Sequence, residues 1–537
     1  MTSTTSPATC GEALIGLLED RGVEVVFGIP GVHTLELYRG LAGSSIRHIT
    51  PRHEQGAVFA ADGYARVSRR CGVCLLITGP GVTNAATAVA SAYHDSQPLL
   101  IISSATASRD ARRGRGALHD LPDQQAFMST ITAFSETVEA PEQLPGAIAR
   151  AFAVLEGPRP RPVHVGIPTD VLDRPVTATA RSSTPAAAPP TPAAADLEGA
   201  VQLLVAAEQP MILLGGGAID AGVAAARISA VTGAPIATTV NGKGAVSESH
   251  PAALGATLTL QPVFGALEHA DVVLAVGTEL SKVDFYYQPE LPSFSGSLIR
   301  VDVDPAQIHG GRSATLGILG EAGATLSALA HRLEALTGED RSARAAARAR
   351  DLRSRLEWWP GAESFFGVLD AIESALPHDA IIAADSTQLA YVASSYLPLR
   401  RPRSYLCPAG YGTLGPALPM AIGAQIAAPE RPVACLVGDG GLLFTVAELA
   451  TAAALGLPIA IVLWHNRGYG EIRDAMDRAG VPHLGTDASA HDFQAIARGF
   501  GCDGVRVSTI EQVAAALGDA FGAGRPTLIE VPAELAG

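Results

Sequence analysis

Two polar side chains, Asp439 and Asn466, follow neighbouring apolar runs that have the composition of buried strands. The runs span 433–437 and 459–464, and both pass into glycine-containing turns. The aspartate stands in the turn Gly-Asp-Gly-Gly, which presents backbone N–H groups to an anion. A carboxylate there would repel a phosphate unless a divalent cation lay between them. Because Asp and Asn oxygens suit Mg²⁺, the pattern predicts a magnesium ion that bridges these side chains to phosphate groups. The alternative is a plain turn, with Asn466 as a helix cap.

A third candidate, Glu54, lies far from this pair in the sequence Pro-Arg-His-Glu-Gln-Gly-Ala. The neighbouring His53 and Glu54 could suggest a zinc site, but the second histidine of the H-E-x-x-H pattern is missing. A zinc site is therefore not predicted. The alternatives are an acid with a chemical role and an ordinary glutamate at the start of a helix.

Taken together, these segments resemble the thiamine-diphosphate-dependent enzymes of the acetolactate synthase and 2-oxo-acid decarboxylase family. The resemblance rests on G-D-G…N at 438–466, G-T-L-G at 412–415 and H-E-Q-G-A…A-D-G-Y-A-R at 53–66. Where the family usually has Asn-Asn, this chain has His465 followed by Asn466. The resemblance covers nearly the whole chain.

The resemblance implies that thiamine diphosphate and Mg²⁺ are the cofactors. Asp439, Asn466 and the backbone carbonyl of Gly468 would hold the metal. Glu54 would bond N1′ of the aminopyrimidine ring and make the cofactor reactive, a task that requires a carboxyl group in a poorly hydrated place.

The remaining cofactor contacts are also taken from the resemblance. Leu414 would replace the family's methionine beneath the cofactor, a change that conserves volume. The carbonyl of Gly412 would accept a hydrogen bond from the 4′-amino group. The other residues implied to contact the cofactor are Pro80, Asn84, Ser386, Thr387, Gly438, Gly440, Gly441, Tyr469 and Gly470.

Two histidines and four acidic residues are candidates for work on the substrate. His33 and His119 fall near active-site positions of the family and could relay protons, or they could be structural surface histidines. Three stretches resemble 5-guanidino-2-oxopentanoate decarboxylases in particular: FGIPGVHTLELYRGL, LHDLPDQ and HNRGYGEIRDAM. A guanidinium group pairs well with carboxylates. The candidates for that pairing are Asp120, Asp123, Glu471 and Asp474, each of which could instead be a solvated loop charge.

The reaction implied is the non-oxidative decarboxylation of a small-molecule 2-oxo acid to an aldehyde and CO₂. An alternative is carboligation to a second carbonyl compound, as in acetolactate synthase. A non-catalytic regulatory paralogue is a third reading, but such proteins usually lose the activating glutamate or the metal ligands, and both are kept here. FAD binds the central domain of acetolactate synthase. The sequence stretches typical of FAD binding are replaced at 255–258 and 277–280, so tight FAD binding is not expected.

In the family, thiamine diphosphate lies between two subunits. The resemblance therefore implies a homodimer or homotetramer.

The sequence predicts an α/β fold, whose sheets would position these residues. Short apolar runs alternate with alanine-rich helical stretches, an alternation typical of parallel sheets covered by helices. Two breaks, at 181–196 and 338–359, divide the chain. The first is a Pro/Ala linker, and the second should be a solvated connecting helix with an exposed basic face. A further helix is predicted over 445–455. We therefore expect three parallel-sheet α/β domains: pyrimidine-binding (1–180), central (197–337) and diphosphate-binding (360–537).

Composition restricts the partners and the location. The 537 residues carry a formal net charge of −15, which argues against non-specific binding to nucleic acid or an anionic membrane. There is no run of about 18 apolar residues that would cross a membrane, and residues 1–7 do not resemble a secretory signal. The six cysteines are scattered. Reduced thiols without a signal predict a cytoplasmic protein.

Overall fold

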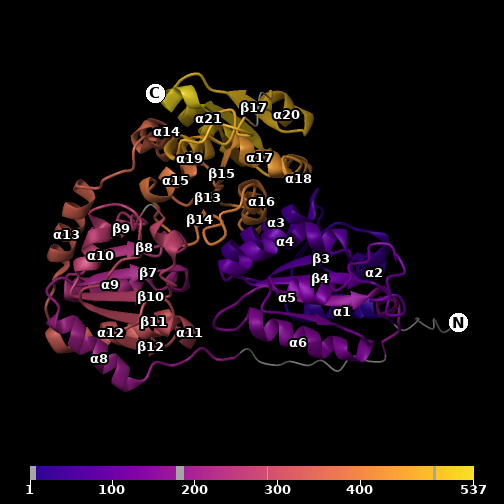
Figure 1. Cartoon of the computed structure of the whole chain (residues 1–537), viewed down its shortest axis with the longest axis horizontal. Coiled ribbons are helices and arrows are strands. Elements are labelled where there is room, and N and C mark those ends of the chain that lie inside the picture. Colours follow the sequence, from indigo (N-terminus) through magenta and orange to yellow (C-terminus); the bar gives the residue numbers. More distant parts are fainter. Residues whose placement is uncertain (1–7, 177–186, 287, 488–490, 537) are drawn as a thin grey trace.

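The computed structural model describes residues 8–176, 187–286, 288–487 and 491–536. Three six-stranded sheets follow one another along the chain, and their paired strands are parallel (Figure 1). The N-terminal unit is drawn on the right, the central unit on the left and the C-terminal unit at the top. The predicted fold class, three parallel-sheet α/β units, is confirmed.

The N-terminal unit has the strand order β2-β1-β3-β4-β6-β5. Its strands are β1 (Val25–Gly28), β2 (Arg47–Ile49), β3 (Gly72–Leu76), β4 (Leu99–Ala105), β5 (Phe134–Thr137) and β6 (Val163–Pro168). Its helices are α1 (Cys10–Asp20), α2 (Leu35–Ala42), α3 (Glu54–Ser68), α4 (Pro80–His94), α5 (Gln124–Ser129), α6 (Leu144–Leu155) and α7 (Thr169–Leu172). Every residue of β3 is buried, because the sheet carries an apolar cluster on each face.

The central unit has the order β12-β11-β10-β7-β8-β9. Its strands are β7 (Met211–Leu214), β8 (Ile236–Thr238), β9 (Ala253–Gly255), β10 (Val272–Val276), β11 (Ser297–Asp302) and β12 (Leu316–Leu319). Its helices are α8 (Ala194–Ala206), α9 (Gly222–Thr232), α10 (Val263–His269), α11 (Pro305–His309) and α12 (Ala322–Thr337).

The C-terminal unit has the order β14-β13-β15-β16-β18-β17. Its strands are β13 (Ile381–Ala384), β14 (Tyr405–Leu406), β15 (Val433–Gly438), β16 (Ile459–His465), β17 (Asp503–Arg506) and β18 (Thr527–Pro532). Its helices are α14 (Phe366–Ala375), α15 (Gln388–Tyr396), α16 (Ala417–Ala427), α17 (Asp439–Thr445), α18 (Glu448–Ala454), α19 (Gly470–Ala479), α20 (Phe493–Gly499) and α21 (Ile510–Gly522). The helix predicted over 445–455 is confirmed in α18. Its predicted start differs, because α17 covers 439–445 and two residues, 446–447, separate the two helices.

The N-terminal and C-terminal units share one apolar core where α3 lies against α16 (Figure 1). Small residues allow the two helices to approach closely. A Cβ atom added to Gly63 would lie 2.7 Å from the Cα of Met420, so only glycine fits there. This contact fixes the start of α3, and with it Glu54, relative to the C-terminal unit of the same chain.

The two connecting segments differ from each other. Residues 181–186 and the predicted domain ends at 1–7, 177–180 and 537 lie outside the described residues, while 187–193 form neither helix nor strand. The second segment contains the predicted helix, α13 (Ser342–Ser354). The expected exposed basic face is present in part: Arg344, Arg350 and Arg355 are exposed. Arg348 and Arg353 are only partly exposed, and both donate to backbone carbonyls of the central unit, as Arg344 also does. Within the described ranges, no helix combines the length and apolar character needed to cross a bilayer.

Candidate active site

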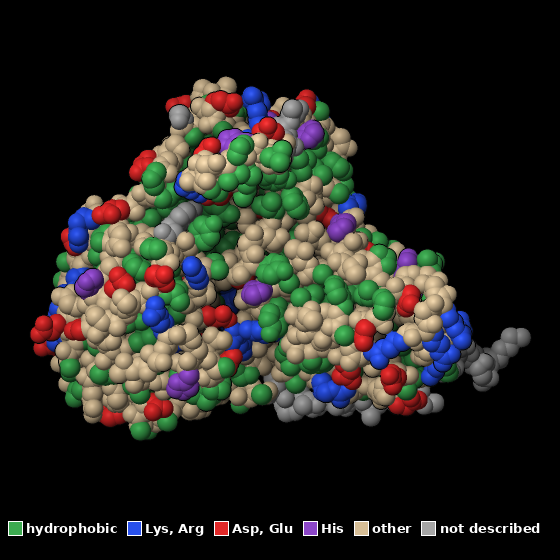
Figure 2. Space-filling model, viewed as in Figure 1, with side chains coloured by type: hydrophobic (Ala, Val, Ile, Leu, Met, Phe, Trp, Pro, Cys, Tyr) green, Lys and Arg blue, Asp and Glu red, His purple; other side chains and the backbone are tan. Residues whose placement is uncertain are grey.

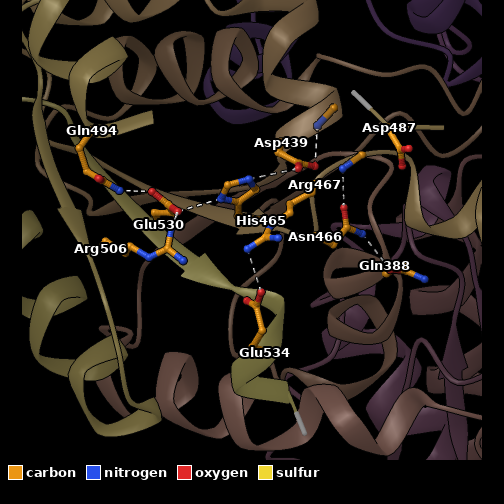
Figure 3. Close-up of polar contacts among 12 residues, drawn as sticks. Gln388, Asp439, His465, Asn466, Arg467, Asp487, Gln494, Arg506, Glu530 and Glu534 are labelled. Carbon is orange, nitrogen blue, oxygen red and sulfur yellow. Dashed lines mark hydrogen bonds and ion pairs between the residues drawn. The ribbon is translucent and has the colours of Figure 1, made fainter. Parts of the chain in front are cut away.

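Asp439 and Asn466 lie side by side at the carboxyl ends of two paired strands. β15 pairs with β16 so that Gly438 faces Trp464, and each polar residue comes just after that level. Asp439 is only 1% exposed, and its Oδ1 accepts a hydrogen bond from the N–H of Gly440 at 2.8 Å. The Asn466 Oδ1 accepts from the Gly468 N–H at 3.3 Å (Figure 3). The two predicted metal ligands and the predicted carbonyl ligand thus belong to one small region.

The oxygens in this region fit a magnesium ion. No group of three or more His, Cys, Asp or Glu side chains that could hold a metal occurs in the described part of the chain. A metal here would therefore use one carboxylate, one amide oxygen and backbone carbonyls, the hard donor set that Mg²⁺ accepts. The turn has no room for a side chain at Gly440, because a Cβ there would lie 2.7 Å from the ring of Tyr469.

Asp385 ties three predicted cofactor segments together. Its carboxylate accepts hydrogen bonds from the N–H of Ser386 at 2.8 Å and of Gly415 at 3.0 Å. The Ser386 hydroxyl in turn donates to the carbonyl of Thr413 at 3.0 Å, beside the predicted Leu414. Burial raises the pKa of Asp385 to about 6. The turn 385–388 and the loop 412–415 are therefore held against each other, as a shared cofactor site requires.

The same turn also reaches the metal region. A Cβ on Gly441 would lie 3.0 Å from Asp385, and one on Gly438 would lie 2.8 Å from the Thr387 hydroxyl. Gln388 accepts from the Asn466 amide at 3.2 Å and donates to Asp474 at 2.6 Å. Asp385 and Gln388 thus belong to the site as well, although only Ser386 and Thr387, which lie between them, were predicted as cofactor contacts.

The pyrimidine half of the site is built from the starts of α3 and α4. Glu54 is the first residue of α3, and its Oε2 accepts a hydrogen bond from the Asn84 amide of α4 at 2.9 Å. Pro80 is the first residue of α4. The neighbouring Gly81 lies close to the Glu54 carboxylate, since a Cβ there would be 3.5 Å away. Three predicted residues from two segments are therefore brought together beyond the carboxyl ends of β2 and β3.

His33 and His119 meet beside this half of the site. Their rings stand edge to face with centroids 5.2 Å apart, and the Nδ1 atoms of both are buried without a hydrogen-bond partner among the described residues. Burial, together with the nearby His119, lowers the pKa of His33 below its usual range. The carbonyl of His119 accepts from the Thr78 hydroxyl at 3.4 Å, two residues before Pro80. Two buried ring nitrogens without partners are available to a ligand.

The four predicted substrate acids fall into two places. Asp120 accepts from the Thr106 hydroxyl at 2.9 Å, and Asp123 caps α5 by accepting from the Ala126 N–H at 3.0 Å, which gives Asp123 a structural role. Glu471 and Asp474 lie on α19, next to the metal region. Burial raises the pKa of Glu471, and Arg478 approaches it only to 3.4 Å.

The two halves are built by different units of the chain. The backbone N–H groups of Arg52 and His53, just before Glu54, donate to the buried Glu448 of α18 at 3.0 and 3.1 Å. Glu54 itself bonds to Asn84 of the N-terminal unit, whereas Asp439 bonds to the Gly440 N–H of the C-terminal unit.

Large apolar side chains are exposed near both halves. Figure 2 shows hydrophobic side chains gathered on the N-terminal and C-terminal units. The exposed ones near the histidine pair are Val32, Leu35 and Leu118, and those near the metal region are Phe444, Ile472 and Leu484.

A cavity of about 750 Å³ lies between the three units, where the acetolactate synthase resemblance would suggest FAD. The glycine turn after β7 faces it, but the N–H groups of Gly215 and Gly217 already donate to the carbonyls of Val276 and Gly277. The cavity wall at the ends of β10 and β11 carries the carboxylates of Glu279 and Asp302. Arg66, Arg159 and Arg403 line the same cavity, but the occupied amides leave Gly215 and Gly217 without free N–H groups for the diphosphate of a dinucleotide.

Comparison with known proteins agrees with this arrangement. Three parts of the chain match domains of thiamine pyrophosphate enzymes, thiamine pyrophosphate being another name for thiamine diphosphate. Residues 8–127 match the N-terminal TPP binding domain, 197–329 the central domain and 385–531 the C-terminal TPP binding domain.

Similar proteins cover nearly the full length. A probable 2-ketoarginine decarboxylase, AruI, of Pseudomonas aeruginosa is 47% identical over 97% of this chain and 94% of its own. A probable acetolactate synthase large subunit of Methanocaldococcus jannaschii is 31% identical over 97% and 92%. The acetolactate synthase isozyme 3 large subunit of Escherichia coli is 30% identical over 95% and 92%. This chain belongs to the family of thiamine pyrophosphate enzymes.

Proposed function

We propose that this protein decarboxylates 5-guanidino-2-oxopentanoate to 4-guanidinobutanal and CO₂, with thiamine diphosphate and Mg²⁺ as cofactors. The observation that carries the proposal is the 47% identity, over nearly the full length, to a protein named as a probable decarboxylase of 2-ketoarginine, which is the same oxo acid. The acetolactate synthase relatives are about a third identical or less.

The residues of the site have separate tasks in this reaction. When bound, thiamine diphosphate supplies the electron sink for the electron pair left behind as CO₂ departs. Asp439, Asn466 and the Gly468 carbonyl would hold the metal and so anchor the diphosphate. Glu54 would hold a proton at N1′ of the aminopyrimidine. His33 and His119, with their free ring nitrogens, would move protons at the substrate.

The assembly completes the site in this proposal. We propose a homodimer, alone or as half of a tetramer, in which Glu54 of one chain faces Asp439 of its partner. It is supported by the construction of the two halves from different units of the chain and by the exposed apolar side chains near each half. We also propose that the protein binds no FAD and resides in the cytoplasm, where its six free thiols would persist. A flavin absorbance in the purified protein would contradict the first of these two statements.

The proposed reaction is tested by incubating the purified protein, thiamine diphosphate and Mg²⁺ with either 5-guanidino-2-oxopentanoate or pyruvate. We expect CO₂ and 4-guanidinobutanal in equal amounts from the guanidino acid, with little turnover of pyruvate. Release of CO₂ from pyruvate alone, with accumulation of acetolactate, would instead favour a carboligase.

Glu471 is the acid best placed to bind the guanidinium group. It is partly buried in the first turn of α19, beside the metal region, and Arg478 donates to it at 3.4 Å. A hydrogen bond to a charged group contributes about 1.5–3 kcal/mol, or roughly 10–100-fold in affinity. Glu471→Gln should therefore raise the KM for 5-guanidino-2-oxopentanoate by about 10–100-fold and leave the KM for uncharged 2-oxohexanoate nearly unchanged.

The matched control for this prediction is Asp477→Asn on the exposed side of the same helix. It should change neither KM. Equal effects of Glu471→Gln on both substrates would show that this carboxylate does not recognise the guanidinium group.

A further inference from the structure

A row of polar side chains crosses four adjacent strands of the C-terminal sheet. Arg506 on β17 pairs in register with Glu530 on β18, and Glu530 pairs with Leu463 on β16. His465 stands two residues beyond Leu463 and so points to the same face of the sheet. Asp439 follows the end of the next strand, β15. The row therefore leads from the sheet edge to the proposed metal ligand (Figure 3).

Glu530 holds the imidazole ring of His465 in one orientation. The Nδ1 of His465 lies 2.8 Å from the Oε1 of Glu530, which is 1% exposed. A hydrogen on Nδ1 can be donated to this carboxylate. Arg506 and Gln494 donate to the same carboxylate, and Arg506 is its cationic partner. The ring of Phe493 packs against that of His465 edge to face, with centroids 5.2 Å apart.

The other ring nitrogen is directed at Asp439. The Nε2 atom is buried, has no hydrogen-bond partner in the described structure, and lies 3.8 Å from the Oδ2 of Asp439. The Oδ1 of the same carboxylate accepts from the Gly440 N–H. One oxygen of Asp439 is thus held by a hydrogen bond, and the other faces the ring of His465.

We propose that His465, oriented by Glu530, is a positioning residue that sets the carboxylate of Asp439 for Mg²⁺ binding. The inference rests on the proposed function of Asp439 as a metal ligand. Residues that orient metal ligands typically change metal affinity by about 10–100-fold when they are replaced.

The test measures Mg²⁺ binding rather than turnover. Full-length protein stripped of metal with EDTA is titrated with Mg²⁺ in a calorimeter at one fixed concentration of thiamine diphosphate, the same for every variant. His465→Asn should raise the Kd for Mg²⁺ by about 10–100-fold, while kcat at saturating Mg²⁺ stays within a few-fold of wild type. Glu530→Gln should raise the same Kd by less, because its amide oxygen still accepts from Nδ1.

The matched control is His483→Asn, which breaks an exposed 2.8 Å contact with Asp477 and should leave the Kd for Mg²⁺ unchanged. A fall in the Tm of the metal-free His465→Asn and Glu530→Gln proteins with an unchanged Kd for Mg²⁺ would show a merely structural role and overturn the inference.

Asp439→Ala, measured in parallel, separates the positioning role of His465 from the metal-binding role of Asp439. If it abolishes Mg²⁺ binding while His465→Asn binds normally, only the positioning role fails. If it binds Mg²⁺ normally, the metal site itself is wrong.

Discussion

Glu54→Gln should lower kcat by about 10²–10⁴-fold, the usual contribution of a general acid or base. Glutamine has nearly the same shape and can keep a contact with Asn84, which now donates to the Glu54 carboxylate at 2.9 Å. It cannot, however, hold a proton at N1′ of the aminopyrimidine as a carboxylic acid does. Steady-state kinetics with saturating cofactors give kcat, and calorimetry gives the Kd for thiamine diphosphate, which should change little.

The control for this prediction is Glu24→Gln, which removes an exposed carboxylate of the same unit and should leave kcat unchanged. A Glu54→Gln protein with normal kcat would refute the role of Glu54. A large loss of cofactor affinity at the same kcat would show instead that Glu54 only binds the cofactor.

Asp439→Ala should remove the Mg²⁺-dependent binding of thiamine diphosphate. The carboxylate is buried in a glycine-rich turn, where a phosphate could not approach it without a cation between them. Loss of a direct metal ligand should exceed the roughly 10–100-fold effect of replacing a residue that only orients one. The Kd for thiamine diphosphate, measured with and without Mg²⁺, should become high and independent of the metal.

Asp519→Ala on the exposed side of α21 serves as the control and should retain the metal dependence. If Asp439→Ala kept a Mg²⁺-dependent Kd close to that of the wild type, the metal would have to bind elsewhere.

Much of this site follows from local sequence. Buried parallel strands read as short apolar runs, and the carboxyl ends of neighbouring strands meet at one edge of a sheet, so Asp439 and Asn466 were expected together. Glu54 and Asn84 were likewise expected at one cofactor, and the structure adds their direct hydrogen bond. Local propensity, by contrast, did not reveal the break in the helix at 446–447, where the buried Glu448 turns toward the start of α3.

Contacts between distant segments could not be read from the sequence. The contact between the rings of His33 and His119 joins two segments that lie far apart in the sequence. The link from His465 to Glu530 depends on strand order, because β18 lies beside β16 although 65 residues separate the two side chains. The spacing of the arginines in α13 predicts an exposed basic face. Arg348 nevertheless donates to backbone carbonyls that only the folded central unit brings within reach.

The central claim is that one active site combines Glu54 of one chain with Asp439 of its partner, and mixed dimers test it most directly. Glu54→Gln and Asp439→Ala chains, each inactive alone, are co-expressed with different affinity tags, and the doubly tagged dimer is purified. Such a dimer has one site with both residues intact, so it should recover about half of the wild-type activity on 5-guanidino-2-oxopentanoate. A doubly tagged dimer as inactive as its parents would contradict a site shared between two chains.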